Sequence, residues 1–142
     1  MRIAIIGASG QVGAFIRDEA LTRGYQVTAI VRHPEKITVQ NPSLTVVKAD
    51  ILKDKVDELV KGHDAVISAY NPGWSNPNIY NEQIEGYEAI ISGVKKSGIK
   101  RLLVVGGAGT LEVTIDRPFI FLIRDIETGA ILFIGRVMNP GA

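Results

Sequence analysis

Cysteine is absent from this chain of 142 residues, which excludes a disulfide framework, a thiolate metal site and a cysteine nucleophile. The two histidines, His33 and His63, are not spaced as metal ligands, so we expect no metal site. No apolar run reaches the ~18 residues of a membrane-spanning helix. Met1 leads directly into a strand-like run, which leaves no room for a signal peptide. The net charge of +1 lacks the basic excess of nucleic-acid-binding proteins. We therefore predict a soluble, cytoplasmic protein without membrane or nucleic-acid partners.

Five short runs rich in Val and Ile are continuously apolar rather than alternating, which is typical of parallel strands covered on both faces. With 46% hydrophobic residues, the chain can bury one core. We predict a single domain, made of a unit over residues 1–112 and a C-terminal segment over 113–142. The predicted strands are Arg2–Ile6, Gln26–Val31, Leu44–Lys48, Ala65–Ala69 and Arg101–Val105.

The segments between these runs have helical spacing and end at glycines, which are suitable C-terminal caps. The predicted helices are Val12–Arg23, Lys53–Lys61 and Asn78–Ser97, the last with Ile84, Tyr87, Ile91 and Val94 facing inward. Alternation of strands and helices indicates right-handed βαβ units. The predicted fold class is therefore α/β, a Rossmann-like doubly wound parallel sheet with strand order 3-2-1-4-5.

The last stretch breaks this alternation. Arg117–Arg124 and Ala130–Val137 are β-rich runs on either side of the polar segment Asp125–Gly129. No crossover helix precedes them, so we predict a C-terminal antiparallel β-hairpin.

A glycine-rich loop, Gly7-Ala8-Ser9-Gly10-Gln11-Val12-Gly13, follows the first strand and opens the first helix. The first glycine permits a tight turn, the second lets the backbone approach a pyrophosphate, and the third lets the helix pack closely on the sheet. The pyrophosphate then meets free N–H groups at the helix N-terminus. The predicted cofactor-binding residues of the loop are Gly7, Ser9, Gly10, Gln11, Val12 and Gly13.

The end of the second strand bears on cofactor choice. Proteins that bind NADH usually place an acidic residue there for the ribose hydroxyls. This chain has Arg32-His33 instead, and Arg32 can pair with a 2′-phosphate. We therefore predict NADP(H), with NAD(H) as the alternative. Asp50 and Ile51 follow the third strand, where Asp50 either contacts the adenine or caps the next helix.

Catalytic residues are harder to predict. None of the four tyrosines has a lysine four residues later, so the Tyr-x-x-x-Lys motif of short-chain reductases is absent. Tyr70 and Trp74 follow the fourth strand, where the nicotinamide is expected. Tyr70 is a candidate proton donor there, and the alternative that we favour is loop packing around Pro72.

Over Met1–Glu112 the chain resembles the NmrA-like, atypical short-chain dehydrogenase/reductase group of NAD(P)-binding proteins. The matching stretches are Ile3–Gly13, Val27–Lys36, Val46–Ile51, Gly62–Ala69 and Arg101–Val113. The resemblance implies a Rossmann fold and NADP(H) binding. Some members reduce quinones, flavins or other small molecules, and others bind the cofactor only as redox sensors.

Residues 113–140 instead resemble the C-terminal β-hairpin of serpins, through Asp116–Arg124 and Gly129–Pro140. The reactive-centre loop of serpins is absent, so no protease partner is expected. The simplest interpretation is a recombined or engineered chimera with its junction near Leu111–Thr114. Its hairpin would cover the edge of the fifth strand or pair with a second chain in a homodimer.

The predicted function is accordingly a truncated dinucleotide-binding domain that binds NADPH without a physiological reaction. One alternative is an NADPH-dependent reductase of a quinone or flavin. The other is a dimeric interaction module that uses the hairpin.

Overall fold

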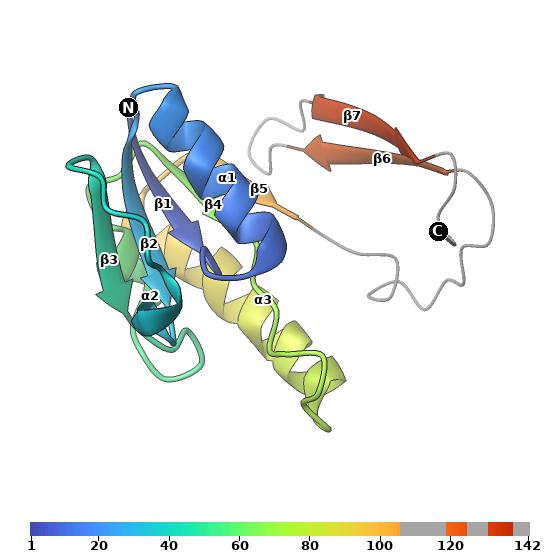
Figure 1. Ribbon diagram of the computed structural model, residues 1–142. Coiled ribbons are helices and arrows are strands. Elements are labelled where there is room, and N and C mark those ends of the chain that lie inside the picture. Colours follow the sequence, from blue (N-terminus) through green and yellow to red (C-terminus); the bar gives the residue numbers. More distant parts are fainter. Residues whose placement is uncertain (106–118, 125–130, 138–142) are drawn as a thin grey trace.

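The computed structural model describes residues 1–105, 119–124 and 131–137, and Figure 1 shows their arrangement. Five strands form one parallel sheet in the order β3-β2-β1-β4-β5. The fold class and the strand order predicted from the sequence are confirmed. The strands are β1 (Arg2–Ile6), β2 (Gln26–Val31), β3 (Leu44–Lys48), β4 (Ala65–Ser68) and β5 (Leu102–Val104).

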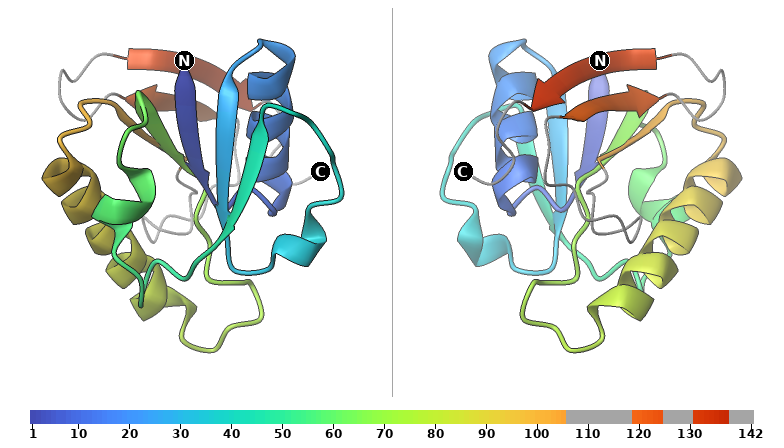
Figure 2. Two further views of the ribbon diagram at one scale, coloured as in Figure 1. Left: turned by 90° about the vertical axis from the view of Figure 1, so that its left-hand side faces the viewer. Right: turned by 90° about the vertical axis from the view of Figure 1, so that its right-hand side faces the viewer.

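Helices cover both faces of this sheet. Helix α1 (Gln11–Thr22) lies on one face, whereas α2 (Val56–Val60) and α3 (Ile79–Ser97) lie on the other (Figure 2). A single 3₁₀ turn, η1 (Pro34–Lys36), follows β2. Helix α2 is shorter than the predicted Lys53–Lys61, because the backbone carbonyl of Asp50 accepts the N–H groups of Lys53 and Asp54 and closes a separate turn there.

The core has two halves, one on each face. Successive residues of β1 point to opposite faces, so Ala4 and Ile6 pack toward α2 and α3 while Ile3 and Ile5 pack toward α1. This burial explains the continuously apolar strands. The edge strand β3 differs, because Val46 on it is 38% exposed.

The C-terminal strands β6 (Phe119–Arg124) and β7 (Ile131–Val137) pair antiparallel, with an irregularity between Ile123 and Arg124. The predicted hairpin pairing is therefore confirmed. This hairpin does not join the parallel sheet, because β6 and β7 form a separate two-stranded sheet. That it covers the edge of β5 stays a prediction. Strand β5 has only three residues, so it offers few backbone groups for pairing. The predicted junction near 111–114 and the turn over 125–129 lie outside the described residues.

Two findings concern only the described residues. None of their helices combines the length and hydrophobicity that a membrane span requires. Nor do three or more of their His, Asp or Glu side chains gather in a way that could hold a metal ion.

Candidate dinucleotide-binding site

The loop between β1 and α1 begins with a turn that requires glycine. Gly7 has φ of +78°, a left-handed conformation that side chains rarely adopt. Its N–H donates a hydrogen bond of 3.0 Å to the carbonyl oxygen of Ile30, which ties the loop to β2. A Cβ at Gly7 would also lie 2.5 Å from the carbonyl oxygen of Ala69. Both backbone conformation and packing therefore exclude other residues here.

The other two glycines differ from one another. A Cβ at Gly13 would overlap the carbonyl oxygen of Gly7, so this glycine lets α1 pack against the start of the loop. A Cβ at Gly10 would meet only the Gly7 carbonyl oxygen, at an ordinary contact distance of 3.6 Å. Gly10 also has an extended backbone, with φ of −73° and ψ of 170°. Nothing in the described chain requires glycine at position 10, so a ligand that approaches the backbone would explain it.

The N-terminus of α1 suits an anion. Gly10 caps the helix without a side-chain hydrogen bond, and the first turn carries no acidic residue. Among residues 1–105, no acceptor takes the Ser9 N–H. Free N–H groups at a helix N-terminus, together with the helix dipole, bind phosphate groups. The loop therefore fits the pyrophosphate of a dinucleotide.

A cleft of about 900 Å³ opens at the carboxyl ends of the strands and includes this loop. That is where open α/β sheets bind their ligands. Most of the residues predicted from the sequence lie together there. They are Gly7, Ser9, Gly10, Gln11, Val12, Gly13, Arg32, Ile51 and Tyr70.

Asp50 is not among the residues that line the cleft. Its carboxylate accepts the N–H of Leu52 at 3.0 Å, and its own N–H donates to the carboxylate of Asp54 at 2.7 Å. Asp50 therefore stabilises the turn after β3. Asp50 is not the N-cap of the helix that follows, because the N-cap residue of α2 is Lys55.

Basic side chains line one end of the cleft. Arg32 lies exposed at the end of β2, and its Nη2 donates to the carbonyl oxygen of Pro72 at 3.3 Å. The turn η1 brings Lys36 to the same cleft. Sequence reasoning missed Lys36, although the 3₁₀ turn that begins at Pro34 was the available signal. Among the described residues that line the cleft there is no Asp or Glu.

Tyr70 lines the cleft but is only 8% exposed. Its hydroxyl donates to the carbonyl oxygen of Glu82 at 3.4 Å, and its ring lies against Gly86 of α3. Burial raises the pKa of Tyr70, while the charge of Arg32 lowers it by less. The raised pKa and the packing support the loop-packing alternative, and proton donation by Tyr70 stays a prediction.

The far wall of the cleft is apolar and aromatic. Trp74 is 88% exposed, and Tyr80 and Ile84 are exposed on the first turns of α3. The expectation that Ile84 faces the core is wrong, because this end of α3 lies beside the cleft rather than over the sheet. Helical spacing placed Ile84 and Tyr87 on one side of α3, and both line the cleft. It did not predict which surface that side meets.

A parallel sheet in this order, with a glycine loop that opens α1 beneath a cleft, defines a Rossmann-type dinucleotide-binding domain. The comparison with protein families agrees, since residues 7–127 match the NAD(P)H-binding family. The chain therefore belongs to that family. The match continues past residue 112, where the sequence resemblance was expected to end.

The relatives are longer than this chain. The uncharacterized protein YwnB of Bacillus subtilis (strain 168) is 40% identical over 113 residues, which cover 80% of this chain and 50% of YwnB. The chain thus spans about half the length of the relatives that it matches.

Two solved structures share the fold. A proposed epimerase from Bacteroides thetaiotaomicron is 56% identical with a TM-score of 0.68, over 76% of this chain and 48% of that one. A proposed NADH-flavin reductase from Streptococcus pneumoniae TIGR4 is 37% identical with a TM-score of 0.61, over 77% and 48%.

A second, shorter likeness concerns serpins. A probable serpin E3 of Danio rerio is 38% identical over 53 residues, which cover 37% of this chain and 13% of the serpin. This similarity accords with the serpin resemblance seen in the sequence. Because the similarity covers so little of the serpin, no serpin function is assigned to this chain.

Proposed function

We propose that this domain binds NADPH in the cleft, with the pyrophosphate on the glycine loop and the 2′-phosphate beside Arg32 and Lys36. The observation that supports this most strongly is the charge of the cleft. Its described lining residues include Arg32 and Lys36 but no carboxylate. A nicotinamide bound there would supply the hydride for any reduction.

The choice of NADPH over NADH rests on the end of β2. A carboxylate at this place accepts hydrogen bonds from the ribose hydroxyls of NADH, and it would repel a 2′-phosphate. Arg32 has the opposite charge, and its planar guanidinium can donate two parallel hydrogen bonds to a phosphate. It is exposed, and within the described part of the chain its guanidinium donates one hydrogen bond, to Pro72, so its other donors are available to a ligand.

Calorimetric titration of the chain with NADPH and, separately, NADH tests this proposal. We expect tighter binding of NADPH, and an Arg32→Met variant that loses about tenfold in NADPH affinity with little change for NADH. Arg23→Met is the matched control, because Arg23 is exposed at the far end of α1, where it pairs with Glu19. Equal affinity of the wild-type chain for the two cofactors would contradict the NADPH preference. An equal loss in the Arg23 variant would remove the role of Arg32.

A second candidate function is an NADPH-dependent reductase of a small molecule such as a quinone or flavin. The exposed aromatic wall formed by Trp74 and Tyr80 favours it, because that wall can contact a planar acceptor beside the nicotinamide. The likeness to a proposed NADH-flavin reductase also supports it. Consumption of NADPH with a quinone or flavin acceptor would establish this activity, and its absence would leave the domain as a cofactor-binding unit.

Two predictions about the C-terminal segment stay open to experiment. One is that residues 113–140 come from a second gene, and the other is that the hairpin of β6 and β7 forms a homodimer. Size-exclusion chromatography over a wide range of concentration tests the dimer, and a monomer throughout would reject it.

A further inference from the structure

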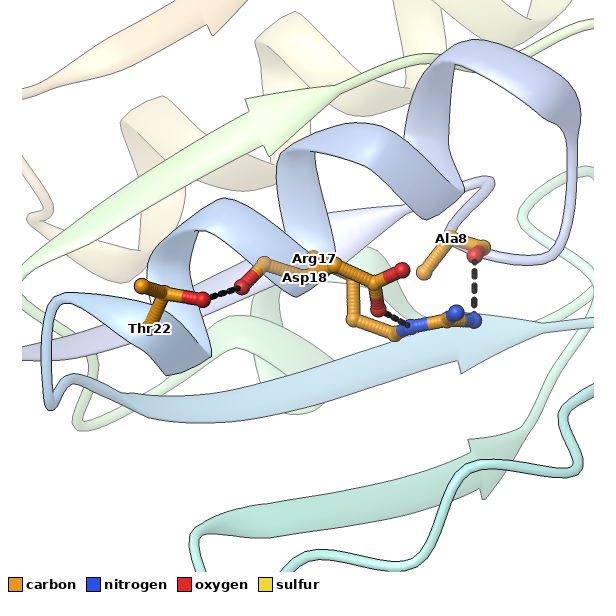
Figure 3. Close-up of polar contacts among 4 residues, drawn as sticks. All are labelled: Ala8, Arg17, Asp18 and Thr22. Carbon is orange, nitrogen blue, oxygen red and sulfur yellow. Dashed lines mark hydrogen bonds and ion pairs between the residues drawn. The ribbon is translucent and has the colours of Figure 1, made fainter.

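A buried arginine lies beneath the glycine loop. Arg17 is only 6% exposed and lies on the same side of α1 as the buried residues Gly13 and Ala20. Figure 3 shows its guanidinium reaching from α1 back to Ala8 in the loop. Burial of a guanidinium is unfavourable unless hydrogen bonds and an opposite charge compensate for it. The contacts of Arg17 therefore indicate what this side chain does.

Among the described residues, Arg17 makes two polar contacts of different kinds. Its Nε donates to the carboxylate of Asp18 at 2.9 Å, and this carboxylate side chain is 54% exposed. Its Nη1 donates to the carbonyl oxygen of Ala8 at 3.2 Å. The first contact balances the charge of Arg17. The second joins α1 to the middle of the loop, at a residue that is itself fully buried.

The hydrogen bond to Ala8 determines where the next N–H points. The Ala8–Ser9 peptide bond is trans, so its carbonyl and its N–H point in opposite directions. With the Ala8 carbonyl directed at Arg17, the Ser9 N–H is directed away from the guanidinium. Ser9 lines the cleft, and its N–H has no acceptor among residues 1–105. Arg17 thus orients a peptide whose free donor belongs to the candidate phosphate site.

We propose that Arg17 is a positioning residue for dinucleotide binding, which holds the Ala8–Ser9 peptide so that the Ser9 N–H is available to the pyrophosphate. The inference rests on the proposed function, because it concerns the same cofactor. Arg17 does not line the cleft, so it acts through the loop rather than by touching the ligand.

Three ligands separate this role from a general effect on folding. NADPH and ADP both carry a pyrophosphate, whereas adenosine 2′-monophosphate carries only the phosphate expected beside Arg32. In Arg17→Met, which keeps an unbranched apolar stem but has no donor, we expect affinity for NADPH and ADP to fall about tenfold. Affinity for adenosine 2′-monophosphate should stay within about twofold of wild type, because this ligand has no pyrophosphate to meet the Ser9 N–H.

Two further variants complete the test. Arg17→Lys keeps one donor group, so its affinity for ADP should lie between those of the wild-type chain and Arg17→Met. It also preserves the test if Arg17→Met fails to fold. Arg32→Met should show the reverse pattern, with weaker NADPH and adenosine 2′-monophosphate binding and unchanged ADP binding. Calorimetry measures the affinities, and thermal unfolding of each variant monitors the fold.

The outcomes are distinct. Unchanged ADP affinity in a folded Arg17→Met variant would overturn the positioning role while leaving the proposed function intact. An equal loss for all three ligands would reduce Arg17 to a structural residue and also overturn the role. Failure of the wild-type chain to bind any of the ligands would instead overturn the proposed function, and the inference with it.

Discussion

The two walls of the cleft are constructed in different ways. On the side of α1, the backbone itself forms the surface, and glycines at positions 7 and 13 are required by contacts with other backbone atoms. On the side of α3, side chains form the surface, and several of them, such as Trp74, are exposed. A backbone surface can recognise only what all dinucleotides share. A side-chain surface can change by substitution without disturbing the fold, so the second wall is where we expect specificity for an acceptor to arise.

The strongest test of this difference is the same substitution on both walls. A Cβ at Gly13 would overlap backbone atoms of Gly7, whereas a Cβ at Gly86 would overlap the ring of Tyr70, which is a side chain rather than backbone. Both glycines are within helices, so the gain in helix propensity cancels. We expect Gly13→Ala to lower the free energy of unfolding by about 3 kcal/mol and Gly86→Ala by about 1 kcal/mol. Urea denaturation measures both, and equal losses would mean that the two walls are equally rigid.

A smaller effect on stability, but a clear one on binding, is expected at Gly10. Because a Cβ there has room and the backbone is extended, Gly10→Ala should change the free energy of unfolding by less than about 0.5 kcal/mol. The added methyl group would keep a pyrophosphate from the loop, so NADPH affinity should fall by about tenfold or more. Calorimetry measures the NADPH affinity of the variant, and urea denaturation measures its free energy of unfolding as the control. Unchanged NADPH affinity would show that the ligand does not approach this part of the loop.

The smallest predicted effect appears only at alkaline pH. Burial raises the pKa of both Tyr70 and Tyr87 above the usual value of 10.0, and a hydrogen bond with Gln83 partly opposes this at Tyr87. The unfolded chain therefore releases these protons first as the pH rises. Their contribution to stability is present below pH 10 and is lost as the pH rises through the pKa of the folded state.

Tyr70→Phe should reduce this alkaline loss of stability, since phenylalanine has no proton to release. Denaturation curves at a series of pH values would measure the slope. A slope in Tyr70→Phe equal to that of the wild-type chain would show that Tyr70 does not contribute to it.

Much of the first wall could be predicted from the sequence, because its features are local. The turn at Gly7 and the close packing at Gly13 follow from glycine spacing between a strand and a helix, and the structure shows the contacts that require them. Local reasoning failed where a longer-range contact decided the outcome. Ile84 has core spacing, but the first turns of α3 lie beside the cleft. Asp50 has a side chain suited to a helix N-cap, but it stabilises the turn after β3, and the N-cap residue of α2 is Lys55.

The sequence by itself determined the class of fold, the strand order and the place of the glycine-rich loop, because hydrophobic periodicity and glycine geometry act over short distances. Only the tertiary structure decided that Lys36 joins Arg32 at the cleft, that the hairpin forms a sheet of its own, and that Arg17 reaches back to Ala8. These outcomes depend on which groups become neighbours when the elements pack, and no local pattern of residues contains that information.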